Sequence, residues 1–306
     1  EEVSAMEHME EGCRQAAGVL PEALRRAAME LDGADRVRVE EFRLRLGRPM
    51  AAVTAQGERE VPGEAVTESD LRSVLEQASR FSAHTVLDQV RAGFVTIRGG
   101  HRIGLCGEAA VQDGKICSLR RLSSLAIRVA KPVCGPAQEV LDAVGGRDRL
   151  CSTLIVAPPG AGKTTLLREL VRRISDGEGA RPLRVGLADE RGEVAAVWEG
   201  RAQLDVGART DVMTGCPKAA GLAILLRGMN PEVLAADEIT APEDIEAVAA
   251  AAGCGVALLA TAHGRSREDL QRRPLYRDLM ALGVFRYVVF LENRRGVRCV
   301  RVEELL

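Results

Sequence analysis

Residues 154–170 read LIVAPPGAGKTTLLREL. An apolar run leads into a turn rich in glycine and proline, and Lys163 then opens a stretch with the apolar spacing of an amphipathic helix. This order of strand, turn and helix matches the phosphate-binding loop of P-loop proteins, with Ala157 in place of the first glycine. Gly160 and Gly162 would let the backbone turn its N–H groups toward phosphates, which the positive end of the helix would also face.

The residues after these glycines carry the chemistry of the loop. Lys163 offers a compact charge to the β- and γ-phosphates, and Thr164 offers a hydroxyl to Mg²⁺. Only four residues of the chain are lysine and all other basic residues are arginine, so a lysine retained here is informative. A chance glycine turn before a helix is the alternative. We predict that ATP and Mg²⁺ bind here, with these contact residues: Pro159, Gly160, Ala161, Gly162, Lys163, Thr164 and Thr165.

An acidic pair follows a second apolar run, because residues 233–238 read VLAADE. In a P-loop protein the Asp that ends such a strand binds the hydration shell of Mg²⁺, and the following Glu can polarise the attacking water. We therefore predict Asp237, with Thr164, as a metal residue and Glu238 as a catalytic one. A solvated Asp-Glu pair after a core strand is the alternative. An adjacent Glu favours a hydrolytic motor over a small-molecule kinase.

Two other strand ends supply catalytic candidates. Residues 187–191 read LADER and repeat the same architecture, so Glu190 is a second candidate for water activation, unless the segment is an ordinary surface loop. Residues 258–264 read LLATAHG and end an apolar run at His263. This histidine could sense the γ-phosphate or could serve only the fold, and the spacing alone leaves both interpretations open.

The segments around these motifs alternate between strand-like and helical patterns. The strand-like runs are 153–157, 183–188, 233–236 and 256–261, and the helical patterns start near 163, 217, 242 and 266. Such alternation is typical of βα units. We therefore predict an α/β fold over residues 149–306, with a mostly parallel sheet covered by helices on both faces.

Residues 1–148 have a different pattern. Helical spacing over 13–31 and 67–80 is followed by short β-like runs between 93 and 129. This predicts a smaller α+β domain in front of the α/β one. Residues 145–149 read GGRDR, a polar and glycine-rich linker, and we place the boundary between residues 148 and 149.

Composition excludes little but narrows the expected partners. The formal charge of −2 and the aromatic content of 3% give no general reason to expect binding to nucleic acid. The eight cysteines form no CxxC pair, so we expect a reduced, intracellular compartment. The longest uncharged apolar run, 247–262, contains two glycines. It is shorter than the ~20 residues that span a bilayer, and we expect no direct membrane insertion.

Together these motifs resemble a known family. The phosphate loop, the DER segment, LLRGMNPE (225–232), AADEIT and ATAHG occur in the order seen in type II/IV secretion ATPases. More narrowly, the chain resembles the stage III sporulation AA family of endospore-forming bacteria. The segments that carry the narrower resemblance are EEFRLRLGRPM (40–50), GFVTIRGGHRIGLCGEA (93–109), SSLAIRVA (123–130) and VGARTDVMTGCPKAAG (206–221).

The resemblance implies a RecA-like P-loop ATPase core behind a small N-terminal domain, working as a hexameric ring. It implies a motor that hydrolyses ATP at the cytoplasmic face of the mother-cell membrane. Its partners would be the membrane-embedded proteins of the channel between mother cell and forespore. It also implies that Asp189 and Glu190 form a second acid box, that His263 forms a histidine box, and that Arg128 reaches a nucleotide.

Some positions depart from the family pattern. Ala126 stands where Asn is usual, Thr240 where Gly follows the acids, and Ala157 where Gly often opens the loop. None of these removes a catalytic group. Two alternatives to the secretion motor stay open: a RecA-like motor that acts on nucleic acid, and a nucleotide-gated assembly factor with little turnover.

Overall fold

The structure, a computed structural model, describes residues 2–79, 93–112, 115–130, 136–145, 150–178, 180–294 and 297–305. Its contacts divide the chain into two units. Unit 1 comprises Glu1–Pro132 and Ala196–Gln203, and unit 2 comprises Val133–Ala195 and Leu204–Leu306. The boundary predicted between residues 148 and 149 lies outside the described residues. The contact division falls earlier in the sequence and returns one later segment to unit 1.

Unit 1 is built on a six-stranded sheet with the order β3-β2-β1-β6-β5-β4, in which every neighbouring pair is antiparallel. Its strands are β1 (Glu41–Arg45), β2 (Pro49–Thr54), β3 (Gly57–Ala65), β4 (Phe94–Thr96), β5 (Arg102–Gln112) and β6 (Lys115–Arg128). Its helices are α1 (Glu2–Ala17), α2 (Glu22–Met29), α3 (Gly33–Arg38) and α4 (Glu68–Ser79), with a short 3-10 turn η1 (Arg98–Gly100). The predicted α+β character is therefore observed.

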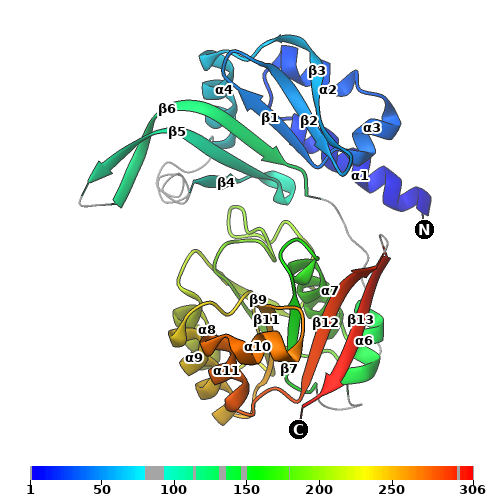
Figure 1. Cartoon of the computed structure of the whole chain (residues 1–306), viewed down its shortest axis with the longest axis vertical. Coiled ribbons are helices and arrows are strands. Elements are labelled where there is room, and N and C mark those ends of the chain that lie inside the picture. Colours follow the sequence, from blue (N-terminus) through cyan, green and yellow to red (C-terminus); the bar gives the residue numbers. More distant parts are fainter. Residues whose placement is uncertain are drawn as a thin grey trace. The chain divides into compact units, whose positions relative to one another are not determined.

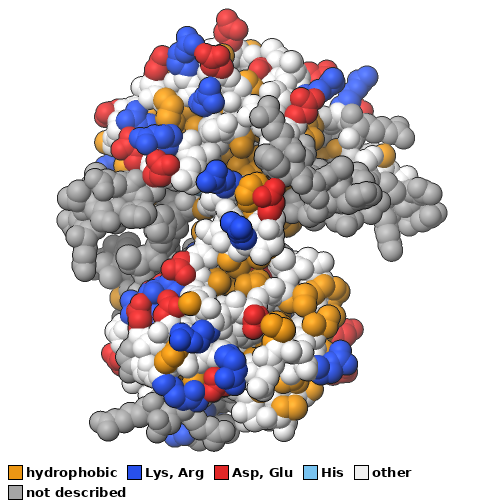
Figure 2. Space-filling view, turned by 180° about the vertical axis from the view of Figure 1, so that it is seen from behind, with side chains coloured by type: hydrophobic (Ala, Val, Ile, Leu, Met, Phe, Trp, Pro, Cys, Tyr) orange, Lys and Arg blue, Asp and Glu red, His pale blue; other side chains and the backbone are white. Residues whose placement is uncertain are grey.

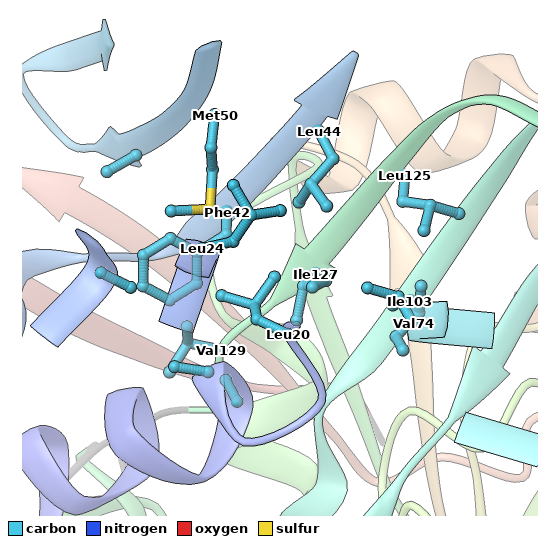
Figure 3. Packing of buried hydrophobic residues seen from close by; sticks show 14 of the residues in the cluster. Leu20, Leu24, Phe42, Leu44, Met50, Val74, Ile103, Leu125, Ile127 and Val129 are labelled. Carbon is cyan, nitrogen blue, oxygen red and sulfur yellow. The ribbon is translucent and has the colours of Figure 1, made fainter. Parts of the chain in front are cut away.

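The core of unit 1 forms where these helices cover the sheet. Figure 3 shows Leu20 and Leu24 from the helical segment facing Phe42 of β1 and Ile127 of β6. The helical spacing over residues 13–31 belongs to two helices, because Pro21 stands at the N-cap of α2 and separates it from α1. A proline has no N–H to continue a preceding helix, which explains the break.

Unit 2 is built on a seven-stranded sheet with the order β13-β12-β7-β11-β10-β8-β9. All neighbouring pairs are parallel except β12 and β13, which form an antiparallel hairpin. The strands are β7 (Thr153–Ala157), β8 (Val185–Asp189), β9 (Thr210–Thr214), β10 (Val233–Ala236), β11 (Ala257–His263), β12 (Tyr287–Arg294) and β13 (Val297–Glu304). The predicted mostly parallel sheet is confirmed. The sequence analysis missed β9 and the hairpin.

Helices cover both faces of this sheet (Figure 1). The helices are α6 (Ala137–Val144), α7 (Lys163–Asp176), α8 (Lys218–Gly228), α9 (Pro242–Gly253), α10 (Arg267–Arg272) and α11 (Pro274–Ala281). In one core cluster, buried residues of α8, α9, α10 and α11 pack with Leu154 and Val156 of β7. The buried Ile155 between them points to the opposite face, where α7 packs. α6 packs on α7 and β13, which is why its residues group with unit 2.

The segment Ala196–Gln203 interrupts the sequence of unit 2 but belongs to unit 1 by its contacts, and we call it the arm. Trp198 and Arg201 exchange backbone hydrogen bonds of 2.9 Å, which closes a tight turn at its middle. The side-chain oxygen of Gln203 accepts the N–H of Gly99 at 3.0 Å. Among the described helices of both units, none is long and apolar enough to cross a membrane.

Candidate nucleotide-binding site

The predicted motifs meet at one edge of the sheet of unit 2. β7, β11, β10 and β8 are consecutive and parallel, so their carboxyl ends lie side by side. The phosphate loop follows β7, His263 ends β11, Asp237 follows β10 and Asp189 ends β8. In open parallel sheets this edge is where ligands bind. The strand order places β11 between the phosphate-loop strand and the strand that leads to Asp237.

The phosphate loop depends on two glycines in the left-handed region. Gly160 has φ of +74° and Gly162 has φ of +97°. A Cβ at Gly160 would meet nothing within 4 Å, so the backbone conformation rather than space requires glycine there. Gly162 is the N-cap of α7, and a glycine has no side-chain oxygen to satisfy the N–H groups of the first helical turn. Those groups and the helix dipole form a binding site for phosphate.

Lys163 is buried at the start of α7. Its Nζ donates to the carbonyl oxygens of Ala157 at 3.2 Å and Pro158 at 3.4 Å, and lies 2.8 Å from Nδ1 of His263. Burial lowers the pKa of Lys163, and nearby carboxylates, that of Glu238 first, oppose this shift. The lysine is therefore held at the mouth of the loop, next to the ends of β10 and β11.

His263 connects Lys163 to Glu238. An ammonium group can only donate hydrogen bonds, so Nδ1 of His263 must accept, and the proton of a neutral ring must sit on Nε2. That Nε2 lies 2.8 Å from Oε2 of Glu238, which accepts from it. We call this arrangement the Lys163–His263–Glu238 relay. It brings together three residues that the sequence analysis proposed separately.

Two residues of the following helices hold His263 in place, and the sequence analysis missed both. The hydroxyl oxygen of the buried Tyr276 accepts the backbone N–H of His263 at 3.1 Å. Nη1 of Arg273 donates to the carbonyl oxygen of His263 at 3.3 Å. Both residues lie near the α10–α11 junction. A cavity of about 620 Å³ opens beside them, and its lining includes Pro159 of the loop and His263.

Asp237 is buried beside the relay, and its Oδ1 accepts a hydrogen bond of 3.3 Å from the hydroxyl of Thr261. Within the described residues, no three His, Cys, Asp or Glu side chains form a metal site on their own. A buried carboxylate and a hydroxyl are oxygen donors of the kind that Mg²⁺ takes, together with retained waters and the phosphates of a substrate. Asp237 and the hydroxyl of Thr164 stay the residues predicted to hold the ion.

The acid at the end of β8 is differently engaged. The Asp189 side chain is 0% exposed, and its carboxylate accepts backbone N–H groups of Glu193 at 2.9 Å, Val194 at 3.1 Å and Ala195 at 2.8 Å. Burial raises the pKa of Asp189, while these hydrogen bonds oppose the shift. Arg168 of α7 donates to the carbonyl oxygen of Glu193 at 2.9 Å. Through its three backbone hydrogen bonds, Asp189 stabilises the conformation of the loop after β8.

The two glutamates of that loop face different partners. Oε2 of Glu190 lies 3.3 Å from Nζ of Lys218, at the start of α8. The carboxylate of Glu193 is one of those whose charge raises the pKa of Lys163. Glu193 is thus a residue near the site that the sequence analysis missed, and no motif in the sequence points to it. The catalytic role of Glu190 stays a prediction.

Arg128 lies in unit 1, on β6. Its side chain is 68% exposed, and its Nε is 3.4 Å from Oε2 of Glu41, which stands opposite it in the register of β1 and β6. The neighbouring Ile127 is fully buried, as the expected alternation along this strand requires. Within its own unit, Arg128 therefore has a carboxylate partner, and its role toward a nucleotide stays a prediction.

Comparisons with solved structures show the fold to be that of secretion ATPases. The ATPase DotB of Legionella pneumophila matches with a TM-score of 0.60 at 16% identity, over 93% of this chain and 81% of that one. The pilus retraction motor PilT with bound ADP matches with a TM-score of 0.59 at 16% identity, over 88% of this chain and 79% of that one. The expected RecA-like fold is confirmed.

Sequence comparisons give the family. The sequence model of the family described as "Sporulation stage III, protein AA" matches residues 10–302. Stage III sporulation protein AA of Bacillus subtilis (strain 168) is 37% identical over 281 residues, which are 92% of this chain and 91% of that protein. The Protein SEEDLING PLASTID DEVELOPMENT 1 of Arabidopsis thaliana is 28% identical over 84% of this chain, but this match covers 34% of that protein. The chain therefore belongs to the sporulation stage III protein AA family.

Proposed function

We propose that this protein hydrolyses ATP as a motor of the secretion-ATPase type. The observation that carries the proposal is the Lys163–His263–Glu238 relay at the mouth of the phosphate loop, with Asp237 buried beside it. A chance glycine turn would not place a cation, a histidine of fixed tautomer and a carboxylate in one hydrogen-bonded series. Such a series supplies both a charge for phosphates and a carboxylate for water.

Each residue of the site has a definable task. The N–H groups at the start of α7 bind the phosphates. Lys163 has three donors, of which two engage Ala157 and Pro158 and the third engages His263, so a phosphate would compete with His263 for that third donor. Glu238, fixed by Nε2–H of His263, is the carboxylate that would orient a water and accept its proton. Mg²⁺, when bound, would neutralise charge on the β- and γ-phosphates.

We extend the proposal to a hexameric ring that works with membrane-embedded channel proteins of sporulation, peripherally at the cytoplasmic face of the mother-cell membrane. The family membership and the secretion-ATPase fold support this setting. A nucleic-acid motor is the weaker alternative. Among the described residues on the face seen in Figure 2, basic and acidic side chains are interspersed over both units, without a continuous basic surface.

The deciding experiment measures ATP turnover against protein concentration, with the mass of the assembly determined on the same samples. We expect the rate per chain to rise as a ring forms. Lys163→Ala should bind no ATP tightly while its circular dichroism stays unchanged. Unaltered ATP affinity in that variant would remove the phosphate-loop interpretation. Multiple-turnover rates close to zero in an assembled ring would favour the assembly factor, and stimulation by DNA would favour the nucleic-acid motor.

Mixing variants tests whether Arg128 acts across a subunit interface. Arg128→Ala should bind ATP almost normally and hydrolyse it slowly. Mixed with Lys163→Ala chains, it should regain part of the turnover, because each chain supplies what its neighbour lacks. If mixtures shown to co-assemble regain nothing, Arg128 belongs to the fold of its own unit, where Glu41 already pairs with it.

A further inference from the structure

A buried lysine outside the phosphate loop links two acidic loops. Lys218 is the first residue of α8, and its side chain is 4% exposed. Its Nζ lies 3.3 Å from Oε2 of Glu190 and 3.8 Å from Oδ2 of Asp244. Glu190 follows β8, whereas Asp244 lies in the first turn of α9, after β10. The lysine therefore joins segments that are far apart in sequence.

The position is unfavourable for a cation without these partners. Burying an ammonium group is strongly unfavourable unless the group is paired with an opposite charge. The N-terminus of a helix carries a partial positive charge, which repels a lysine in the first turn. In a chain whose basic residues are almost all arginine, a lysine here indicates a need for a compact charge between two carboxylates. The pairing with Glu190 and Asp244 thus explains why this residue is tolerated.

Each carboxylate holds a different part of the site. Oδ2 of Asp244 also accepts the N–H groups of Thr240 at 3.0 Å and Ala241 at 3.1 Å, and so fixes the end of the loop that carries Glu238. Glu190 begins the loop that Asp189 folds and that carries Glu193. The charges of Glu238 and Glu193 both act on Lys163. Lys218 therefore bridges the two loops whose acids face the phosphate-loop lysine.

We propose that Lys218 is a positioning residue for ATP hydrolysis, which fixes the loop after β8 relative to the loop after β10 through Glu190 and Asp244. The inference rests on the proposed ATPase function. We call the contacts of Lys218 with Glu190 and Asp244 the bridge. In this arrangement Glu190 is one end of the bridge, and its charge acts on the reaction through Lys218. Small displacements of reacting groups have large effects on rate, so loosening the bridge should reduce kcat while the phosphate loop still binds ATP.

The test uses Lys218→Met, which keeps the length of the side chain and removes its charge. We expect kcat to fall by about tenfold and the affinity for a fluorescent ATP analogue to stay within about twofold. Lys218→Arg, which keeps the charge, should recover part of the rate. Arg227→Met is the matched control, because Arg227 is exposed at the other end of α8 and donates to the carbonyl oxygen of Ala223. It should change neither quantity.

A double-mutant cycle separates the bridge from a general loss of stability. Glu190→Gln should lower kcat by a similar factor, and the double variant should be no slower than either single one, because both remove the same contact. Additive losses, or an unchanged kcat in either variant, would overturn the inference. If Lys218→Met does not fold, the hydrogen exchange of Glu190→Gln still decides, because Glu190 is 41% exposed and its replacement leaves no buried cavity.

Hydrogen exchange tests the bridge without any nucleotide. In Glu190→Gln the amides of Thr240 and Ala241 should exchange faster than in the unaltered protein, since Lys218 and Asp244 are then no longer tied to the loop after β8. Unchanged exchange of both amides would refute the bridge even if the ATPase is active. Conversely, a protein without ATP turnover that still shows the faster exchange would refute the proposed function and leave the bridge intact.

Discussion

β8 and β10 are neighbouring strands with almost the same sequence ending, and their acids do different things. The sequence reads LADE where β8 ends and LAADE where β10 ends. Asp189 is taken up by three successive backbone N–H groups of its own loop, while Asp237 accepts from the hydroxyl of Thr261 and lies beside the relay. The loop that follows each strand makes the difference. A carboxylate that accepts the backbone N–H groups of the following loop fixes the fold of that loop. A carboxylate that is not used in this way is available to bind a cation.

The largest effect is expected from the acid after Asp237. Glu238→Gln keeps the shape of the side chain and removes the charge that accepts the proton of water. We expect kcat to fall by a factor on the order of 10² or more, with ATP bound and retained unhydrolysed. Single-turnover assays with labelled ATP would measure both. Glu246→Gln, an exposed change on α9, is the control. A fast Glu238→Gln enzyme would move the role of base to the loop after β8.

A stability effect should distinguish Asp189 from Asp237. Asp189→Asn places an amide NH₂ among N–H donors in a fully buried site, so the free energy of unfolding should fall by about 2 kcal/mol. Urea denaturation would measure it. Asp205→Asn is the matched control, because Asp205 also accepts a backbone N–H, from Gly207 at 3.0 Å, but is exposed. Equal losses in the two variants would show that burial does not make Asp189 special.

The smallest effect concerns the two glutamates of the loop after β8. Glu193→Gln removes a negative charge that acts on Lys163, so ATP should bind about threefold more tightly. Glu190→Gln should leave the affinity unchanged, since Glu190 faces Lys218. Titration with a fluorescent ATP analogue would resolve the difference. The reverse order of affinities would mean that Glu190 is the acid nearer the phosphates.

Much of unit 2 was predictable because its buried parallel strands are short apolar runs that end in polar residues. The predicted starts of α7, α8, α9 and α10 agree with the structure to within a residue. β9 was missed for a physical reason. It is the edge strand, every residue in it is half-buried, and its sequence TDVMT has no apolar alternation to detect. The hairpin of β12 and β13 at the other edge was missed as well.

The site was predictable at the level of strand ends but not of loops. Lys163, Asp237, Glu238 and His263 each follow an apolar run, and parallel pairing brings such ends together. The different fate of Asp189 could not be predicted, because it depends on how six residues of loop fold back onto a carboxylate. Lys218 and Tyr276 come from helices, whose contacts with the site depend on packing rather than on any motif.

The arm Ala196–Gln203 has a practical consequence. It begins directly after Ala195, whose N–H is bound to Asp189, and it carries Trp198, the only tryptophan of the sequence. Tryptophan emission from the whole protein therefore comes from a single segment, which directly follows the loop after β8. Without any label or added dye, the emission maximum and the fluorescence intensity of Trp198 report whether adding a nucleotide alters the surroundings of the arm.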